Sequence, residues 1–433
     1  MKPVLGIVLE YGFHEVKKYI HSGLAKSLTE RFRIVWIALD KNNDLFDSYF
    51  RVVGEKVVYV SNNDLVRPKV RLERINSSVR RNWMICRNLG GFHNYVLLPN
   101  NSLKAKILGC EFAKYLLENL TLNRINKYHN QELQRLLKAS DVKKIIVTNY
   151  SSLFVRNLAA TAKNMDLDLY LLINSWKDLY TNNYIPFKNF NKIFVWDVKM
   201  KTDYLFHMPY LLAESIIVSG NPSFDYLNQS SPSFDREYYC RKYKVSKDSK
   251  WIYYTMMPPG IFNDEFLTVL FIADSFYKKY GLDYIFLVRR NPNHKSNEFD
   301  DFEVPENVRI TEHYCSFDES LDMLIQSKEG EREWLDLLHH TYVNFSVPST
   351  VTMEYIALGK RVFNISFNSK NNQELSLKQF FESGFYRDMF NEQSVVRIDS
   401  IQQLMVEIDL SFDHLDITKA IKASDIILKE LVN

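Results

Sequence analysis

The stretch YVNFSVPSTVTMEYIALGKRVFNISF, residues 342–367, shows the fold of this chain most clearly. Its pattern predicts a buried strand at 342–345, a polar loop at 346–350, a helix at 351–358, a glycine turn at Gly359 and a second strand at 361–365. A buried strand that leads through a helix into another buried strand is typical of a parallel sheet.

The start of this predicted helix suits a phosphate group. Ser349 and Thr350 bring two hydroxyls to the end of a helix where backbone N–H groups are free and the dipole is positive. Glu354, one turn later, is placed to accept a hydroxyl of a ribose or sugar. The alternative is structural: Ser349 and Thr350 only cap the helix, and Glu354 closes a capping box. Local chemistry leaves both interpretations open.

Further apolar, β-rich runs alternate with amphipathic segments along the chain. Strands are predicted at residues 4–9, 34–38, 56–60, 144–148, 169–173 and 192–196, and in a second series at 216–219, 251–255, 284–288, 308–310, 342–345 and 361–365. Helical patterns lie between them, among others at 16–31, 154–164, 264–280 and 331–340. Near-continuous apolar strands separated by helices predict an α/β fold with two parallel sheets in tandem, each covered on both faces.

The length of the chain, 433 residues, is too great for one core, so two or three domains are expected. The break between the two series of strands lies near residues 205–215. We therefore predict an N-terminal Rossmann-like acceptor domain at 1–207 and a C-terminal Rossmann-like donor domain at 208–412. The remaining segment, 413–433, is predicted to carry an amphipathic helix that packs back on the N-terminal domain.

The composition is that of an ordinary globular protein, with 46% hydrophobic and 25% charged residues. Its 13 glycines argue against wide glycine-rich nucleotide loops, and its net charge of +3 selects no partner. The four cysteines lie far apart without metal-binding spacing, which is typical of free thiols in a reducing compartment. Without a signal-peptide pattern or an apolar run of membrane-spanning length, we expect a cytoplasmic protein, or one bound peripherally at the inner face of the cytoplasmic membrane.

One region of the sequence is locally basic. Between residues 67 and 87 Glu73 is the only acid, and the basic residues are Arg67, Lys69, Arg71, Arg74, Arg80, Arg81 and Arg87. A solvated helix face explains such a run, and the functional alternative is contact with an anionic acceptor or a membrane surface. No nucleic acid is expected as a partner, because the sequence matches no nucleic-acid-binding module.

Residues 175–227, SWKDLYTNNYIPFKNFNKIFVWDVKMKTDYLFHMPYLLAESIIVSGNPSFDYL, carry a family resemblance. They resemble the middle of GT-B glycosyltransferases of bacterial surface polysaccharide biosynthesis (capsule and lipopolysaccharide), which are related to the capsule and teichoic-acid polymer transferases. These families have a Ser-Trp-Asp turn, then a strand ending in Val-Trp, then a strand ending in a Gly-x-Pro-x-Phe-Asp turn. Here Lys177 separates Trp176 from Asp178, and the second turn begins at Gly220.

The likeness continues in YIFLVRRNPNHK, residues 284–295. These families end this strand with Arg and a His-Pro pair, whereas here Asn291 precedes the proline and His294 follows it. The resemblance places the turn against the phosphate or ribose of an activated donor, and a surface-charged strand end is the structural alternative. The donor-binding residues that the resemblance implies are Arg289, Arg290, His294, Ser346, Ser349, Thr350, Glu354, Gly220 and Pro258. For Pro258, a plain strand-to-helix turn remains open.

The resemblance implies a GT-B fold, in which two Rossmann-like domains turn their parallel sheets toward an interdomain cleft. The nucleotide would lie at the carboxyl ends of the C-terminal strands. Helix dipoles and basic side chains would stabilise the leaving phosphate, so no metal and no other cofactor is expected. The sequence agrees, because it has no credible Asp-x-Asp metal motif.

An inverting transferase needs a base that faces the acceptor. His14 and Glu10 follow the first predicted strand and are our catalytic candidates, because either side chain can take a proton from a hydroxyl. The alternative for His14 is an exposed residue at the start of a helix.

The sequence therefore predicts a metal-independent GT-B glycosyltransferase that uses a nucleotide-sugar donor and a glycan or lipid-linked glycan acceptor. A CMP-linked acidic sugar is an attractive donor, and UDP or GDP sugars fit almost as well. The alternatives are a polyol-phosphate transferase of the CDP-glycerol type and a non-catalytic GT-B-like binding subunit. A non-hydrolysing sugar epimerase shares the outline, but its set of acidic and histidine groups was not found in the sequence.

Overall fold

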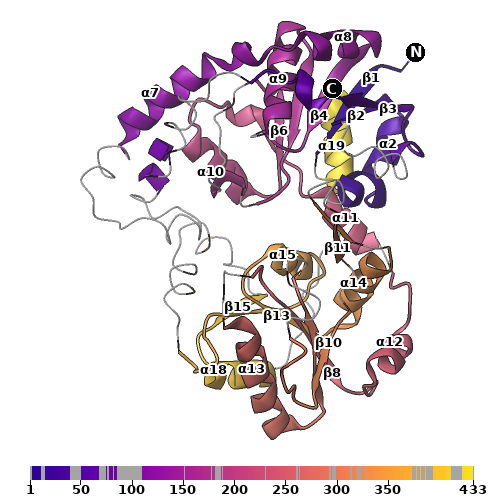
Figure 1. The fold of residues 1–433 in the computed structure, drawn as a ribbon, viewed down its shortest axis with the longest axis vertical. Coiled ribbons are helices and arrows are strands. Elements are labelled where there is room, and N and C mark those ends of the chain that lie inside the picture. Colours follow the sequence, from indigo (N-terminus) through magenta and orange to yellow (C-terminus); the bar gives the residue numbers. More distant parts are fainter. Residues whose placement is uncertain are drawn as a thin grey trace. The chain divides into compact units, whose positions relative to one another are not determined.

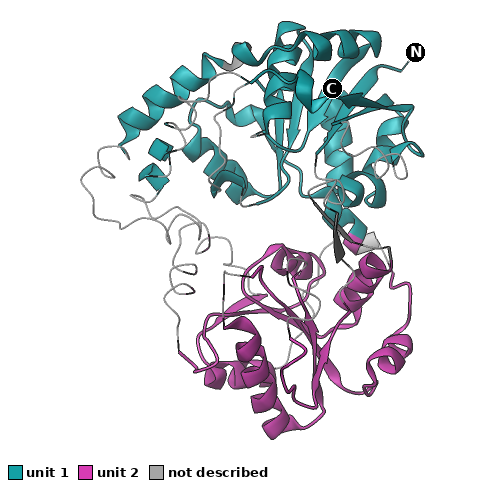
Figure 2. Ribbon diagram, viewed as in Figure 1, with its two compact units in different colours: residues 1–226, 383–385, 421–433 teal, residues 227–382, 386–420 magenta. Residues whose placement is uncertain are grey.

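The structure is a computed structural model of the chain. It describes residues 2–10, 15–39, 50–67, 75, 78–80, 82–84, 110–150, 152–176, 178–180, 187, 189–229, 231–259, 262, 264–291, 294, 299–312, 315–318, 323–326, 328–372, 377, 381, 386, 394–410 and 422–432. Two compact units divide the chain (Figure 2). Unit 1 takes in residues 1–226, 383–385 and 421–433, and unit 2 takes in residues 227–382 and 386–420.

Unit 1 is built on a seven-stranded parallel sheet with the order β3-β2-β1-β4-β5-β6-β7 (Figure 1). Its strands are β1 Val4–Leu9, β2 Arg33–Leu39, β3 Lys56–Val60, β4 Val142–Val147, β5 Asp168–Leu172, β6 Lys192–Val195 and β7 Ile216–Val218. β1 pairs with β2 on one side and with β4 on the other. The strand order therefore reverses between β1 and β4, and the carboxyl ends of these two strands flank the point where α/β sheets commonly bind ligands.

Side-chain caps fix several helices of unit 1. Asn130, Ser152 and Asp197 each accept a hydrogen bond from the backbone at the start of a helix. The main helical segments are η1 Val16–His21, α2 Leu24–Thr29, α7 Glu111–Leu122, η4 Ile125–Tyr128, α8 Gln131–Ala139, α9 Leu153–Asn164, α10 Val198–His207, α11 Pro222–Gln229 and α19 Ala423–Val432.

The C-terminal helix α19 belongs to the core of unit 1. Ile427 and Leu431 are fully buried in a cluster with residues of β1, β2 and α2. Asp225, in α11, accepts hydrogen bonds from the backbone N–H groups of Ala423 (3.0 Å) and Ser424 (2.8 Å). One carboxylate thus caps a helix that follows it by about two hundred residues in the chain.

Unit 2 contains a six-stranded parallel sheet with the order β10-β9-β8-β13-β14-β15. Its strands are β8 Lys250–Thr255, β9 Tyr284–Arg289, β10 Val308–Ile310, β13 Val343–Ser346, β14 Val362–Ile365 and β15 Val395–Ile398, and a separate antiparallel pair joins β11 Cys315–Asp318 to β12 Met323–Gln326. The two parallel sheets confirm the predicted α/β class of two Rossmann-like units. The predicted cleft between them, and the predicted domain boundaries, stay predictions.

One strand was predicted in the wrong sheet. The run at 216–219 was grouped with the second series, whereas β7 pairs with β6 in the sheet of unit 1. An apolar run identifies a strand but not its partner, and the short β6–α10–β7 connection keeps these two strands neighbours.

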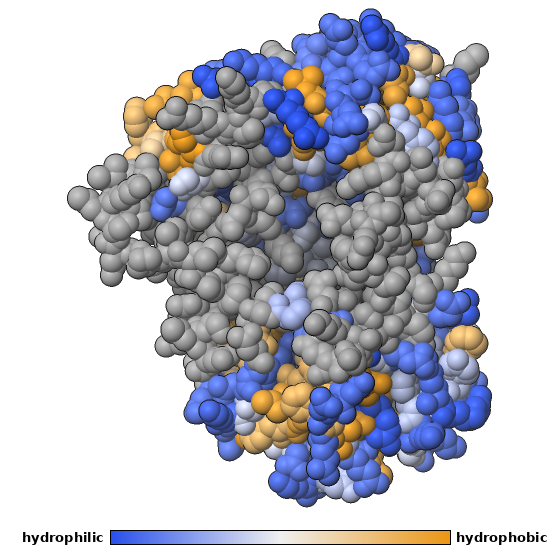
Figure 3. Space-filling view, in the orientation of Figure 1, coloured by the Kyte–Doolittle hydropathy of each residue, from blue (hydrophilic) through white to orange (hydrophobic). Residues whose placement is uncertain are grey.

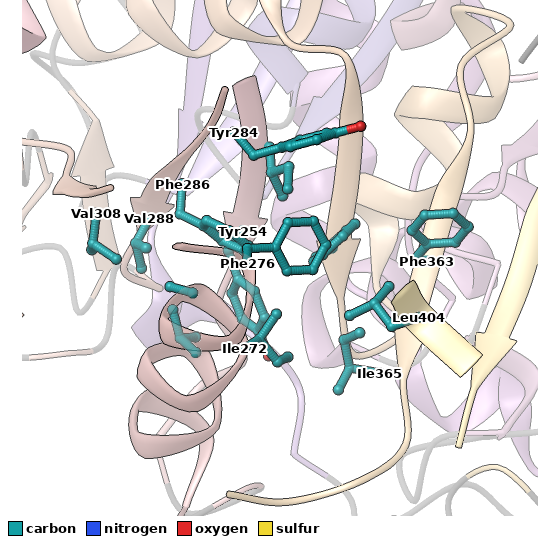
Figure 4. Packing of buried hydrophobic residues seen from close by; sticks show 14 of the residues in the cluster. Tyr254, Ile272, Phe276, Tyr284, Phe286, Val288, Val308, Phe363, Ile365 and Leu404 are labelled. Carbon is teal, nitrogen blue, oxygen red and sulfur yellow. The ribbon is translucent and has the colours of Figure 1, made fainter. Parts of the chain in front are cut away.

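The helices α13 Glu265–Tyr280 and α18 Ile401–Asp409 cover one face of the second sheet with an apolar core (Figures 1 and 4). The Phe276 ring of α13 lies 5.2 Å from the ring of Phe286 and 6.0 Å from that of Phe345. On the opposite face lie α14 Lys328–His340 and α15 Thr350–Ala357, where Trp334 contacts Tyr253 at 5.5 Å between ring centroids. The helix α12 Arg236–Tyr243 also belongs to this unit.

Replacing Asp225 by alanine is expected to destabilise unit 1 by about 2–3 kcal/mol, because two buried N–H groups lose their acceptor. Urea denaturation followed by circular dichroism measures the loss. The matched control is Asp425→Ala, which removes an exposed carboxylate from the first turn of the same helix and is expected to change stability by less than about 0.5 kcal/mol. Equal losses in both variants would show that Asp225 does not anchor α19.

Candidate functional site

Four adjacent strands of unit 2 end in a row of polar residues. The register pairs Arg289 of β9 with Thr255 of β8, Thr255 with Ser346 of β13, and Ser346 with Asn364 of β14. Neighbouring strands lie about 4.8 Å apart, so the row brings the predicted donor residues Arg289 and Ser346 to the same edge of the sheet, about two strand spacings apart. The carboxyl edge of a parallel α/β sheet is the usual position of a ligand site.

A buried hydrogen-bond network lies beneath this edge. The Asn344 side chain donates to the Tyr253 carbonyl (2.8 Å) and to the Thr255 hydroxyl (3.2 Å), and it accepts from the Ser346 hydroxyl (2.9 Å). Asn344 and Ser346 are fully buried, and both point to the face of the sheet opposite the apolar core. Since a buried polar group costs about 1–3 kcal/mol when it is left unpaired, these bonds hold the strand ends in one arrangement.

A second set of buried hydrogen bonds lies under the helix α15. The Thr352 hydroxyl donates to the Asn364 side chain (3.5 Å), which in turn donates to the Tyr386 hydroxyl (2.9 Å). Ser349 is the N-cap of α15 and forms a capping box with Thr352. The capping box with Glu354 that the sequence left open is therefore wrong, because counting from Ser349 places Thr352, and not Glu354, at the third helical position.

Thr350 and Glu354 do not belong to the capping box of α15. Thr350 is the first residue of α15 and is exposed, whereas Glu354 is half-buried one turn later. Around the buried Tyr253, burial raises the pKa of the phenol, the Arg289 guanidinium lowers it and the Glu354 carboxylate raises it. Arg289 and Glu354 thus lie on the same face of the sheet, within electrostatic reach of one side chain.

Arg289 has an aromatic support. Its guanidinium lies 3.9 Å from the ring centroid of Trp334 in α14. Such a contact orients the guanidinium and leaves its N–H donors available at the ring edge for a planar or tetrahedral anion. Arg290, the next residue, is half-buried and takes part in further interactions.

His294 lies against the loop after β8. Its Nε2 atom is 2.9 Å from the Met257 carbonyl, and the imidazole is 8% exposed against the ring of Phe299. The Met257 N–H donates to the Glu265 carboxylate at 2.9 Å. Met257 is therefore held from both sides, and this fixes the approach of the half-buried Pro258. The contact gives His294 a positioning role for the loop, and its predicted contact with a donor stays a prediction.

Gly220 lies in unit 1, apart in the sequence from the other predicted donor residues. Its φ of +85° requires glycine, and a Cβ atom there would lie 3.3 Å from the Cβ of Ala423 in α19. The turn therefore has a clear packing reason for glycine, and its donor contact stays a prediction.

The strand ends β1, β4 and β5 of unit 1 carry a second polar cluster. The buried Glu15 carboxylate accepts hydrogen bonds from the Glu10 N–H (2.8 Å) and the Thr148 hydroxyl (3.1 Å). Lys18 donates to the Asn174 side chain at 2.9 Å, and burial lowers the pKa of Lys18 to about 8 although Glu15 and Asp178 raise it. Glu10 lies at this edge, half-buried, whereas His14 lies outside the described residues. Both stay catalytic predictions.

Sequence reasoning missed Tyr253, Asn344, Thr352 and Asn364 in the site of unit 2. A signal was present, because Asn344 and Ser346, and again Asn364 and Ser366, stand two residues apart in otherwise apolar strands. Polar residues with a period of two point to one face of a strand. That pattern indicates a polar face near the carboxyl edge.

Within the described part of the chain, no group of three or more His, Cys, Asp or Glu side chains is arranged to hold a metal ion. Metal independence itself stays a prediction. None of the helices that the structure describes combines the length and the apolar character needed to cross a membrane.

Comparison with solved structures shows what this fold resembles. UDP-GlcNAc 2-epimerase from Neisseria meningitidis bound to UDP-GlcNAc has a TM-score of 0.55 at 14% identity, with 100% of each chain covered. The Methanocaldococcus jannaschii UDP-GlcNAc 2-epimerase, in complex with UDP-GlcNAc and UDP, gives 0.55 at 12% identity, with 100% of this chain and 99% of that chain covered. The Staphylococcus aureus MnaA–UDP structure gives 0.54 at 12% identity, covering 100% and 95%.

These likenesses show the fold and confirm the GT-B-like class that the sequence predicted. At such low identity a shared fold does not carry a shared reaction. No family model matches the chain, and no curated protein matches it.

The buried Glu265 generates a prediction of pH dependence. Burial raises the pKa of its carboxyl to about 8, against a usual value of 4.5. Because the folded-state pKa is the higher one, the stability that this group contributes is fully present below about pH 4.5 and is lost as the pH rises through about 8. Glu265→Gln is expected to remove a decline of up to about 1.4 kcal/mol per pH unit across that window.

Melting curves of the wild type and Glu265→Gln between mildly acidic and mildly basic pH check this expectation. Glu237→Gln serves as the control, because Glu237 is an exposed carboxylate in the first turn of α12. Parallel pH profiles for wild type and Glu265→Gln would contradict the burial argument.

Proposed function

We propose that this chain is a glycosyltransferase that moves a sugar from a nucleotide-activated donor to a surface-glycan acceptor. One observation carries the proposal: the start of α15, fixed by a buried polar network, shares an edge and a face of the sheet with Arg289. A helix start and a guanidinium at one edge form an environment that favours a phosphate.

Each residue of that edge has a distinct part in the proposal. The backbone N–H and the exposed hydroxyl of Thr350, the first residue of α15, bind phosphate oxygens, and Arg289 and Arg290 supply positive charge. Glu354 accepts a hydroxyl of the ribose or sugar. As the sugar leaves its phosphate, negative charge grows on the phosphate oxygens, and fixed donors stabilise it without reorganising.

The network under α15 explains why this arrangement is suited to catalysis. Ser349 and Thr352 satisfy each other across the cap, so the first turn does not need the ligand in order to form. Preorganised donors stabilise charge better than donors that must first be ordered. Ser346 acts in the proposal by supporting Asn344 rather than by reaching a ligand, because its hydroxyl is buried.

The acceptor side is assigned to unit 1. The Glu15 carboxylate accepts a hydrogen bond from the N–H of Glu10, at the end of β1. Glu10 and His14 remain the proposed proton acceptors for the attacking hydroxyl of a glycan or lipid-linked glycan. No metal is invoked in either step.

The solved structures of similar fold and the sequence resemblance each suggest donor nucleotides. The structures of similar fold are described with UDP or UDP-GlcNAc bound, which favours a uridine nucleotide. The sequence resemblance to surface-polysaccharide transferases leaves CMP-linked acidic sugars, GDP sugars and CDP-glycerol as the other candidates.

A second candidate is a nucleotide-sugar 2-epimerase. The observation that favours it is the set of epimerase structures whose fold spans this whole chain at a TM-score of about 0.55. Both candidates use the same phosphate-binding edge, so they are separated by what happens to the sugar.

The nucleotide-binding proposal is tested by a thermal-shift series with CMP, CDP, UDP and GDP. One of them is expected to raise the melting temperature, because a ligand that binds only the folded state stabilises it by mass action. Arg289→Ala and Thr350→Val are each expected to weaken that nucleotide about tenfold or more, since each loses a hydrogen bond to a charged group.

Arg241→Ala and Thr202→Val are matched controls for these variants, because Arg241 and Thr202 are exposed helical residues outside the site. They are expected to leave the ligand-induced shift unchanged. A flat response to all four nucleotides, or an equal loss in the control variants, would overturn the donor-site assignment.

The reaction class is tested by proton and phosphorus NMR of the binding nucleotide sugar after incubation with the protein. A transferase is expected to leave the C2 configuration intact without acceptor and to release free nucleotide when glycan acceptor is added. Appearance of the 2-epimer without acceptor would replace the transferase by the epimerase. Phosphorus in the product linkage would indicate a polyol-phosphate transferase, and an unchanged sugar with nucleotide bound would indicate a binding subunit.

A further inference from the structure

The helix α7 of unit 1 buries polar side chains and exposes apolar ones, the opposite of an ordinary surface helix. Its polar side chains Lys114 and Glu118 are 3% and 2% exposed. Its apolar side chains face outward, with Phe112 73%, Tyr115 59%, Leu116 45% and Leu120 41% exposed. These four residues recur with the spacing of one helix face and form a continuous apolar stripe along α7.

A buried ionic cluster holds α7 in this rotation. Glu118 lies between Arg80 (3.6 Å) and Lys114 (3.4 Å). Lys114 also donates to the His207 carbonyl at 2.7 Å, and Arg80 lies 2.9 Å from the Nδ1 atom of His207 and donates to the Leu179 carbonyl at 3.0 Å. Turning the helix to bury the stripe would break these contacts and leave buried charges without partners, which is strongly unfavourable.

The buried face of α7 also contacts an aromatic ring, that of Trp83, which is 1% exposed. Lys114 lies 4.6 Å from the ring of Trp83, and that ring lies 5.7 Å from the ring of Phe206 in α10. Phe206 is itself 53% exposed. Figure 3 shows hydrophobic residues gathered at the place where Figure 1 labels α7.

The sequence around α7 has an unusual charge. From Arg67 to Lys127 the chain carries twelve Lys and Arg against three Asp and Glu, a net charge of +9, whereas the whole chain carries +3. Arg80, Lys114 and Glu118 lie in the buried cluster, and without them ten cations and two acids remain, a net charge of +8. Arg124 and Lys127, which directly follow α7, are exposed.

We propose that the stripe formed by Phe112, Tyr115, Leu116 and Leu120 docks this protein on an anionic lipid bilayer. Aromatic and aliphatic side chains on one face of a helix enter the interfacial region of a bilayer, and nearby cations are attracted to acidic headgroups. The exposed cations Arg124 and Lys127, which follow α7, and the positive charge of this part of the sequence favour an anionic membrane over a second copy of this chain, whose facing stripe would bring like charges together. The proposal is independent of the reaction at the nucleotide edge.

Vesicle flotation of the full chain tests the proposal. Wild-type protein is expected to float with vesicles of mixed phosphatidylcholine and phosphatidylglycerol, much less with phosphatidylcholine alone, and less as salt is raised. Leu116→Gln/Leu120→Gln is expected to lower the partition coefficient about tenfold or more, because the bilayer contact loses two exposed leucine side chains.

Leu267→Gln/Val406→Gln is the matched control. Leu267 in α13 is 45% exposed, as Leu116 is, and Val406 in α18 is 63% exposed, and both lie on helices of unit 2. The control is expected to float as the wild type does, and melting curves of both variants report that they fold.

Three outcomes would overturn the proposal: no flotation of the wild type, equal flotation on both kinds of vesicle at all salt concentrations, or equal loss in the stripe and control variants. A smaller molar mass in light scattering for the stripe variant, without vesicle binding by the wild type, would instead assign the stripe to contacts between copies of the chain.

Discussion

The rest of the candidate site depends on the hydrogen bonds of the Asn344 side chain, which hold the ends of two neighbouring strands in place. Two of these bonds join β13 to the Tyr253 carbonyl and to the Thr255 hydroxyl of β8. The third bond comes from the hydroxyl of Ser346, the last residue of β13 before the loop that leads to α15. A parallel sheet usually fills both faces with apolar side chains. Unit 2 does so on the α13 face and places a polar network on the other. Because every bond in such a network constrains its neighbours, the ends of β8 and β13 have defined positions at the edge that they share with Arg289.

The charged side chains at the strand ends of the two units differ in how far they are exposed. In unit 2 the cation Arg289 rests on Trp334 and remains half-buried, so its charge is available to a ligand. In unit 1 the charged groups Glu15 and Lys18 are buried and bonded to the strand ends of β1, β4 and β5. The former suits binding of an anion, and the latter suits holding a loop. The proposed division into a donor side and an acceptor side follows from this difference.

The sequence predicted those features that depend on local pattern. The segment predicted as strand, loop, helix and strand corresponds to β13, α15 and β14 within one residue or so at each end, because Ser349 is a strong N-cap and the strands are apolar. The sequence did not predict the features that depend on tertiary partners. β7 pairs in the sheet of unit 1, and β15 was not recognised because Arg397 interrupts its apolar run. Thr352, and not Glu354, completes the capping box of α15. The orientation of α7 was equally hidden, since an apolar stripe on a helix is normally read as a core face.

Amide hydrogen exchange with and without the nucleotide that raises the melting temperature tests the central claim most directly. The account predicts that bound nucleotide slows exchange of the backbone N–H group of Thr350 and of those around Arg289, because these groups line the phosphate-binding edge. Protection confined to the strand ends of β1, β4 and β5, with no change at the start of α15, would contradict it.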